Sequence, residues 1–248
     1  MIDKIIVMNL PAETRRRYLC EGALLAKGVP LDRFQIWECI DDKAYEKSQK
    51  LCEDASDDKI EQYTKLLDSG MYKHVPIAIL AQQWNYFRIM RYIIEKRITA
   101  IVMHDDTILG LKFERLQAII SILKNRGNFH LLLLNCFRKP HVLHNELTPI
   151  CAHSIIMHGI CGSYDLGVIY SPRGANWVLN THTFENDTVK LEDFYMLCSL
   201  GKIDQPKGCY TVFNDQYSHK EMGNRVYCPS TIFKPNTWDP IREPIDTN

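Results

Sequence analysis

The stretch that decides the fold runs from Ile98 to Gly110 and reads ITAIVMHDDTILG. Residues 100–103 form a short all-apolar run, which is typical of a central strand covered on both faces of a sheet. Asp105 and Asp106 follow at the point where this strand leaves the core. In open α/β sheets, ligands bind at the edge outside the carboxyl ends of the strands. The stretch therefore predicts a ligand site at the end of a buried strand.

The two adjacent carboxylates indicate what this ligand contains. Neighbouring anions repel each other unless a cation or a proton offsets the cost. A divalent metal ion that holds a phosphorylated substrate is the simplest explanation. The alternative interpretation is an aspartate-rich turn that caps the following helix. The strand-end position alone does not separate the two.

The composition favours a large globular domain of the α/β class. The chain has 248 residues with 46% hydrophobic content, and its 30 basic residues balance 30 acidic ones. This neutrality disfavours nucleic acid as a partner, although Lys112, Arg115, Lys124 and Arg126 could form a local basic groove. No apolar run approaches the roughly 20 residues that span a membrane, so we expect no transmembrane segment.

The cysteines and the N-terminal residues bear on the cell compartment. The nine cysteines include no CxxC pair, so a zinc site has weak support and most of them are expected to be small buried residues. The first residues lead directly into a short strand-like run, so no signal peptide is expected. A reduced, cytoplasmic protein is the prediction.

Strands and helices alternate in the first part of the chain, which predicts a mostly parallel central sheet with right-handed crossovers, as in Rossmann-like folds. Predicted strands cover 4–10, 34–40, 100–103 and 129–135, and predicted helices cover 11–27, 75–96 and 111–124. A polar segment at 43–69 is expected to be a surface insertion. The second part is predicted to be less regular, with strands at 165–170, 209–213 and 225–228, helices at 172–179 and 192–200, and a loop-like tail from 233.

Four segments, in this order, resemble glycosyltransferase family 25, which contains lipooligosaccharide and collagen galactosyltransferases. Asn9 and Leu10 end the first strand and precede the arginines 15–17, and a long helix leads into the strand that ends in Asp105 and Asp106. The third segment, GSYDLGVIYSPRGANWVL, carries Tyr170, Ser171, Gly174 and Ala175 at the family's "Tyr, apolar, Ser, x, x, Gly-Ala" pattern. The fourth is LEDFY at 191–195, where the family has an acidic residue that opens a late helix.

The chain departs from the family pattern in two places. His104 stands where the family has the first acid of a Glu-Asp-Asp triplet. The Gly-Cys and Ser-His features of the preceding helix are missing, and Ala81 and Gln83 lie nearby instead. His104 leaves two outcomes open, namely a tuned metal site or a loss of activity.

The resemblance implies a GT-A-like domain over residues 1–248, with a nucleotide-sugar-binding half at 1–135 and an acceptor-binding half at 136–248. It implies transfer of a sugar from a nucleotide-diphosphate sugar, with a UDP-sugar expected, to a hydroxyl of a glycan, lipooligosaccharide or protein acceptor. The expected cofactor is Mn²⁺ or Mg²⁺, and the reaction is expected to invert the anomeric centre.

The metal site is expected to centre on Asp106 as the direct ligand. Asp105 is expected to bind through water or to contact the ribose. His104 is a candidate ligand, with packing through one hydrogen bond as the alternative. His219 is the candidate third ligand, with Asp215 in its place or an ordinary surface role as the alternatives.

The remaining candidate residues concern the donor and the acceptor. Asp193, with Glu192 beside it, is the predicted base that deprotonates the acceptor hydroxyl, although acids in a first helical turn also simply complement the helix dipole. Arg15 and Arg16 are predicted to contact the diphosphate, since at most two of three successive arginines on a helix can face one site. The residues predicted to border the base or ribose are Asn9, Leu10 and Asp41, with an ordinary turn role as the alternative for Asp41. Trp84 and Tyr86 are expected to pack in the core.

Two other functions compete with sugar transfer. A metal-dependent phosphatase or phosphotransferase of the haloacid dehalogenase type needs Asp-x-Asp-x-Thr, but aligning its second aspartate on Asp106 puts His104 at the nucleophile and Ile108 at the threonine. A binding or scaffold protein that kept the fold and lost catalysis is the other alternative, and His104 is the main argument for it.

Overall fold

The computed structural model describes residues 1–40, 77–136, 147–151, 154–160, 167–182, 191–214 and 232–233. The polar segment predicted at 43–69, the strand predicted at 225–228 and the tail after 233 lie outside these residues. Within the described ranges, no helix is both long and apolar enough to cross a membrane.

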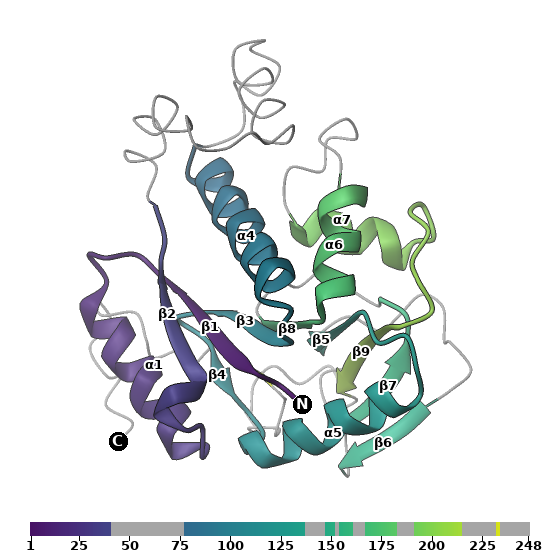
Figure 1. The fold of residues 1–248 in the computed structure, drawn as a ribbon, viewed down its shortest axis with the longest axis horizontal. Coiled ribbons are helices and arrows are strands. Elements are labelled where there is room, and N and C mark those ends of the chain that lie inside the picture. The colour runs from purple at the N-terminus through teal and green to yellow at the C-terminus, as the bar shows by residue number, and fades with distance from the viewer. Residues whose placement is uncertain are drawn as a thin grey trace, which may run out of the picture.

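One eight-stranded sheet forms the centre of the described part, with the strand order β2-β1-β3-β8-β5-β9-β7-β6 (Figure 1). The strand pairings make β7 and β8 antiparallel to the others. The strands are β1 (Lys4–Asn9), β2 (Phe34–Glu38), β3 (Ala100–His104), β5 (Leu131–Cys136), β6 (Leu147–Cys151), β7 (Ser154–His158), β8 (Gly167–Tyr170) and β9 (Cys209–Asn214). A separate antiparallel pair joins β4 (Ile108–Leu109) to β10 (Ile232–Phe233).

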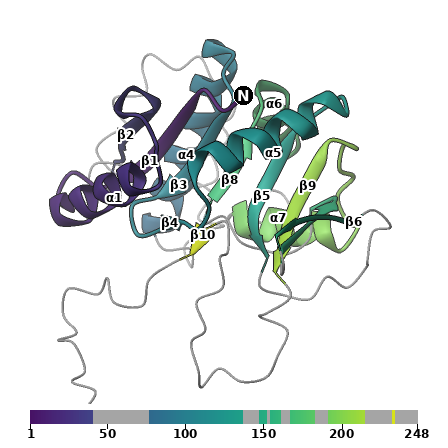
Figure 2. The ribbon, with the colours of Figure 1, turned by 90° about the horizontal axis from the view of Figure 1, so that it is seen from below.

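Helices cover both faces of this sheet (Figures 1 and 2). They are α1 (Thr14–Ala26), α4 (Ile77–Lys96), α5 (Phe113–Asn125), α6 (Pro172–Thr181) and α7 (Leu191–Ser199), with a 3-10 turn η1 (Leu31–Arg33) before β2. Alternate residues of β1 face opposite sides, so Ile5 and Val7 pack with α1 and α5, while Ile6 and Met8 pack with α4, α6 and α7. The predicted α/β class with a mostly parallel sheet is confirmed.

The strand order reverses at β1. From β1 the chain passes through α1 to β2 on one side, and it later returns through α4 to β3 on the other side of β1. Because the two crossovers leave in opposite directions, α1 and α4 cover opposite faces, and the carboxyl ends of β1 and β3 flank the point between them. Such a switch point is where open α/β sheets bind ligands.

The segment with Tyr170, Ser171 and Gly174 connects β8 to α6, at the edge of the sheet opposite to the aspartates. Tyr170 pairs with Ala100 at the start of β3, and its hydroxyl is hydrogen-bonded to that of Tyr195 in α7. Ser171 caps α6 by accepting from Gly174 N (3.1 Å), and its Oγ donates to the Phe129 carbonyl (2.8 Å). This part of the family pattern therefore serves packing far from the aspartates.

The sequence predicted neither β6 nor β7. They form an antiparallel pair that extends the sheet beyond β9, so the described part of the second half is more regular than expected. Pro149 lies within β6, and a proline inside a short run ordinarily argues against a strand. Here the proline is tolerated because β6 is the last strand of the sheet in the described part of the chain.

Candidate functional site

The candidate site lies at the carboxyl ends of β1, β2 and β3. These three strands are parallel neighbours, with Asn9 opposite Glu38 and Met8 opposite His104. Beyond the last pair, Asp105 N donates to the Met8 carbonyl (3.1 Å), so the ladder continues into the first aspartate. The carboxyl ends of β1, β2 and β3 therefore lie together at one edge of the sheet.

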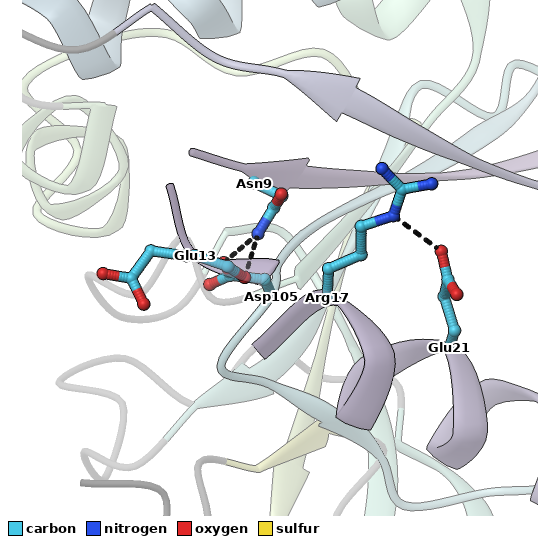
Figure 3. Close-up of polar contacts among 5 residues, drawn as sticks. All are labelled: Asn9, Glu13, Arg17, Glu21 and Asp105. Carbon is cyan, nitrogen blue, oxygen red and sulfur yellow. Dashed lines mark hydrogen bonds and ion pairs between the residues drawn. The ribbon is translucent and has the colours of Figure 1, made fainter. Parts of the chain in front are cut away.

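Asn9 joins four segments at this edge. Its side chain is buried, and its Nδ2 donates to Asp105 Oδ2 (2.7 Å) and to the Glu13 main-chain carbonyl (3.2 Å) (Figure 3). Its own main-chain carbonyl accepts from Cys39 N (2.9 Å), just after β2. Asn9 therefore orients the Asp105 carboxylate and ties it to the start of α1.

Asp105 is a buried carboxyl, only 7% exposed. Burial raises the pKa of its carboxyl above the ordinary value, the Asn9 hydrogen bond lowers it, and the Asp106 carboxylate raises it again. The charges of Arg16 and His104 also oppose the rise. The ligand-free site thus disfavours the ionised form of Asp105, and a bound cation would reverse this preference.

Asp106 follows in a tight turn and is half-buried. Thr107 closes the turn, because its N (3.2 Å) and its Oγ1 (2.6 Å) both donate to the His104 carbonyl. The aspartates thus lie in a turn, as the alternative interpretation proposed, but they do not cap the next helix, because α5 begins at Phe113 with Lys112 at its N-cap. The same turn holds both carboxyl groups at the switch point.

His104 is turned toward α4. Its Nε2 lies 2.6 Å from the Tyr86 hydroxyl and 3.4 Å from Gln82 Nε2. Tyr86 is 1% exposed, and Trp84 is partly buried against the same core, as expected for packing residues. A metal ion can bind His104 Nε2 only if the hydrogen bond with Tyr86 breaks. Nδ1 is the other ring nitrogen that can bind a ligand.

The arginines of α1 point in different directions, as their helical spacing predicted. Arg17 Nε pairs with Glu21 (3.0 Å, Figure 3), and Arg16 Nε pairs with Glu13 (3.4 Å). Arg15 is exposed, whereas the Arg16 charge is felt at Asp105. The first turn of α1 contains no acid and Glu13 makes no side-chain cap, so the positive end of the helix dipole and the Arg15 charge are not offset by a carboxylate within that turn. This arrangement favours a bound anion.

The remaining predicted residues are only partly brought to this edge. Leu10 follows β1 and is 39% exposed. Asp193 is half-buried in the first turn of α7, and the side chain of Glu192 lies outside the described part. The residues predicted at the base, the ribose and the third metal position, Asp41, Asp215 and His219, also lie outside the described residues.

The donor set suits a hard divalent cation. In the described ranges no three His, Cys, Asp or Glu residues form a cluster that could hold a metal ion alone. Mg²⁺ and similar ions are, however, commonly held by one or two carboxylates together with phosphates of the substrate. Asp105 and Asp106 can supply these carboxylates. The nearby thiols are unsuited as ligands, because burial raises the pKa of Cys20 and of Cys39 to about 12.

The polar side chains of α4 belong to this edge and were not predicted from the sequence. Gln83 and Asn85 are 1% exposed, and their amides bond main-chain groups of other segments. The sequence contains a pattern that could have indicated them, because Gln82, Gln83 and Asn85 interrupt the apolar residues in the first half of this helix. Buried amides of this kind need partners, and the partners here lie beside the site.

Comparison of the sequence with protein-family models and with curated proteins gave no match.

Asp105 provides a stability test of this geometry. Because its folded-state pKa is raised, ionised Asp105 destabilises the ligand-free fold at neutral pH, and this penalty disappears as the pH falls below the ordinary carboxyl range. Asp105→Asn is expected to stabilise the protein at pH 7, with no gain near pH 3. Asp105→Ala is expected to destabilise it by about 1–3 kcal/mol, because the buried Asn9 Nδ2 loses the closer of its two acceptors. Urea unfolding at pH 7 and at pH 3 measures the free energy of unfolding of each variant. An equal loss of stability in Asp105→Asn and Asp105→Ala at pH 7 would contradict the raised pKa of the Asp105 carboxyl.

Proposed function

We propose that this protein is a metal-assisted glycosyltransferase with a GT-A-like fold, which moves a sugar from a nucleotide-diphosphate sugar to an acceptor hydroxyl. The observation that carries the proposal is the Asp105–Asp106 pair at the switch point between β1 and β3, with Asp105 held by Asn9 at 2.7 Å. Two adjacent carboxylates, one of them buried, are costly to hold without a cation. The family resemblance agrees, because it puts the metal and the diphosphate at this same pair.

The donor side of the proposal uses groups from β3 and α1. A bound Mn²⁺ or Mg²⁺ would neutralise the diphosphate leaving group as a Lewis acid. The Asp105 and Asp106 carboxylates would hold it. Helix α1 begins beside Asp105. Its first N–H groups and the Arg16 side chain would bind the phosphates, and Arg15 would lie further out. We take a UDP-sugar as the donor on the resemblance alone.

The acceptor side of the proposal uses α7. Asp193 would accept the proton of the acceptor hydroxyl while that oxygen attacks the anomeric carbon, and the nucleotide diphosphate would leave. Glu192 is the neighbouring alternative. A direct attack of this kind inverts the anomeric centre. The acceptor would be a glycan, a lipooligosaccharide or a protein hydroxyl.

A second candidate is a nucleotide-binding protein without transfer activity. One observation favours it, namely that the ring of His104, in the place of the family's first acid, is engaged by Tyr86 at 2.6 Å. The phosphatase alternative has less support, because Ile108 takes the position of its threonine and lies in β4, paired with Phe233.

A thermal-shift screen of UDP- and GDP-sugars, with and without Mn²⁺, separates these functions. A transferase is expected to be stabilised by one nucleotide class only when the metal is present, through mass-action linkage. It is also expected to release nucleoside diphosphate slowly from the matching sugar. Stabilisation without any turnover would favour the binding protein, turnover of phosphate esters would favour the phosphatase, and indifference to every nucleotide would contradict the proposal.

Asp193→Asn tests the assignment of the base. The variant is expected to bind UDP and Mn²⁺ with unchanged affinity and to lose about 100-fold or more in kcat, because a carboxamide cannot accept the proton. Initial rates with a saturating donor, beside calorimetry of UDP binding, give the two quantities. Wild-type rates in this variant would remove Asp193 as the base.

A further inference from the structure

The first half of α4 buries side chains that helices ordinarily expose. Gln83, Asn85 and Tyr86 are each 1% exposed, whereas Arg88 in the same helix is exposed. A buried amide that lacks a hydrogen-bond partner destabilises the fold, so buried amides are nearly always hydrogen-bonded.

Each of these side chains reaches a different segment of the site edge. Asn85 bonds both main-chain groups of Ile40, accepting from its N and donating to its O at 3.1 Å each. Tyr86 reaches His104 at 2.6 Å, and Gln82 lies 3.4 Å from the same ring nitrogen. Gln83 Oε1 accepts from Leu191 N at 2.9 Å. These residues of α4 thus contact the end of β2, the end of β3 and the start of α7.

Gln83 makes the contact that matters for the acceptor side. Leu191 is the first residue of α7, and its N–H is one of the helix-terminal donors that no carbonyl within α7 can satisfy. Leu191 is fully buried, so water cannot replace the Gln83 carbonyl. The proposed base, Asp193, lies two residues further on in the same first turn.

We infer that Gln83 is the positioning residue for Asp193, an inference that rests on the proposed function. By holding Leu191 N, Gln83 fixes the first turn of α7 against α4 and so sets where the Asp193 carboxylate meets the acceptor hydroxyl. The rest of α7 has other anchors, since Phe194 and Tyr195 are fully buried and the Tyr195 hydroxyl bonds Tyr170. Loss of the Gln83 contact therefore loosens the first turn and leaves α7 docked.

The donor side does not depend on this contact. Gln82 and Tyr86 hold His104, and Asn9 holds Asp105, without Gln83. A variant at Gln83 is thus expected to change the catalytic rate and to leave donor binding intact. A misplacement of about 1 Å in a reacting group can cost about 100-fold in rate.

The test compares three variants at Gln83 with the wild type. Gln83→Met keeps the volume and removes the strong acceptor, and Gln83→Asn keeps the amide on a side chain one methylene shorter. Both are expected to lower kcat by 10- to 100-fold, with donor KM and UDP affinity within twofold of the wild type. Gln83→Glu restores an acceptor of the same length at a helix N-terminus, where a carboxylate is favoured, and is expected to keep at least a third of the wild-type kcat.

Gln117→Leu is the matched control. Gln117 makes the same kind of amide-to-main-chain bridge, to Ile2 N (2.6 Å) and Ile2 O (2.8 Å), at the start of β1 and away from the site. Its loss is expected to lower Tm as much as Gln83→Met does, with kcat unchanged.

Three results would overturn the inference. The first is a wild-type kcat in both Gln83→Met and Gln83→Asn, and the second is a fall in UDP affinity that matches the fall in kcat. The third is an equal loss of kcat in Gln117→Leu, which would assign the effect to stability alone. A wild-type protein that binds no nucleotide and turns over no donor would instead overturn the proposed function, and the inference with it.

Discussion

Asp106→Ala is expected to lower the affinity for UDP in the presence of Mn²⁺ by about 100-fold or more, because it removes the proposed direct ligand of the metal. The fold should tolerate the change, since Asp106 is a half-buried turn residue and the turn is closed by Thr107 and the His104 carbonyl. We expect Tm without ligands to stay within about 2 °C of the wild type. Calorimetric titration with UDP, with and without Mn²⁺, measures the loss.

Asp32→Ala is the control for this prediction. Asp32 is exposed in η1, beside the start of β2 at the other edge of the sheet, so its removal subtracts the same charge without touching the site. It should leave UDP affinity unchanged. An Asp106→Ala variant that binds UDP and Mn²⁺ like the wild type would rule Asp106 out as the ligand.

Gly174→Ala is expected to produce a large loss of stability from a single methyl group. A Cβ at Gly174 would lie 2.0 Å from the main-chain oxygen of His130, a separation that no real contact permits. The same oxygen accepts from Ser171 N (2.8 Å), so α6 and the start of β5 must separate to make room. We expect a loss of about 3 kcal/mol or more, which lowers Tm by about 10 °C in a chain of this size.

Gly22→Ala is the matched control for the added methyl group. A Cβ at Gly22 meets nothing within 4 Å on the exposed side of α1, so alanine should stabilise that helix by about 0.5–1 kcal/mol. Differential scanning fluorimetry of both variants gives the comparison. Equal Tm values would mean that Gly174 does not approach His130 in solution.

The sequence predicted the site edge because neighbouring residues determine it. The apolar runs that end at Asn9 and at His104 mark two buried strands, and alternation with helices makes them parallel, so their ends must meet at one edge. The arginine spacing likewise predicted that only part of the 15–17 cluster can face the site. Each of these inferences needs only neighbouring residues and the helical or strand period.

The rest depends on contacts between distant residues. β8 lies between β3 and β5 although it follows both in the sequence, and only tertiary pairing decides that position. The engagement of His104 by Tyr86 required the register of α4 against β3, which apolar periodicity does not set to one residue. The same holds for Gln83 and Leu191, which are 108 residues apart. The role of Gly174 depends on the approach of the His130 backbone, which no local pattern encodes.

The central claim is that a divalent metal and a nucleotide diphosphate bind where β1 and β3 end. The most direct measurement is a crystal of the protein soaked with UDP and Mn²⁺, with diffraction data collected near the manganese absorption edge. We predict an anomalous peak bonded to a carboxylate oxygen of Asp106, with the diphosphate between the metal and the N-terminus of α1. Nucleotide bound elsewhere, or a manganese peak remote from Asp105 and Asp106, would contradict the claim.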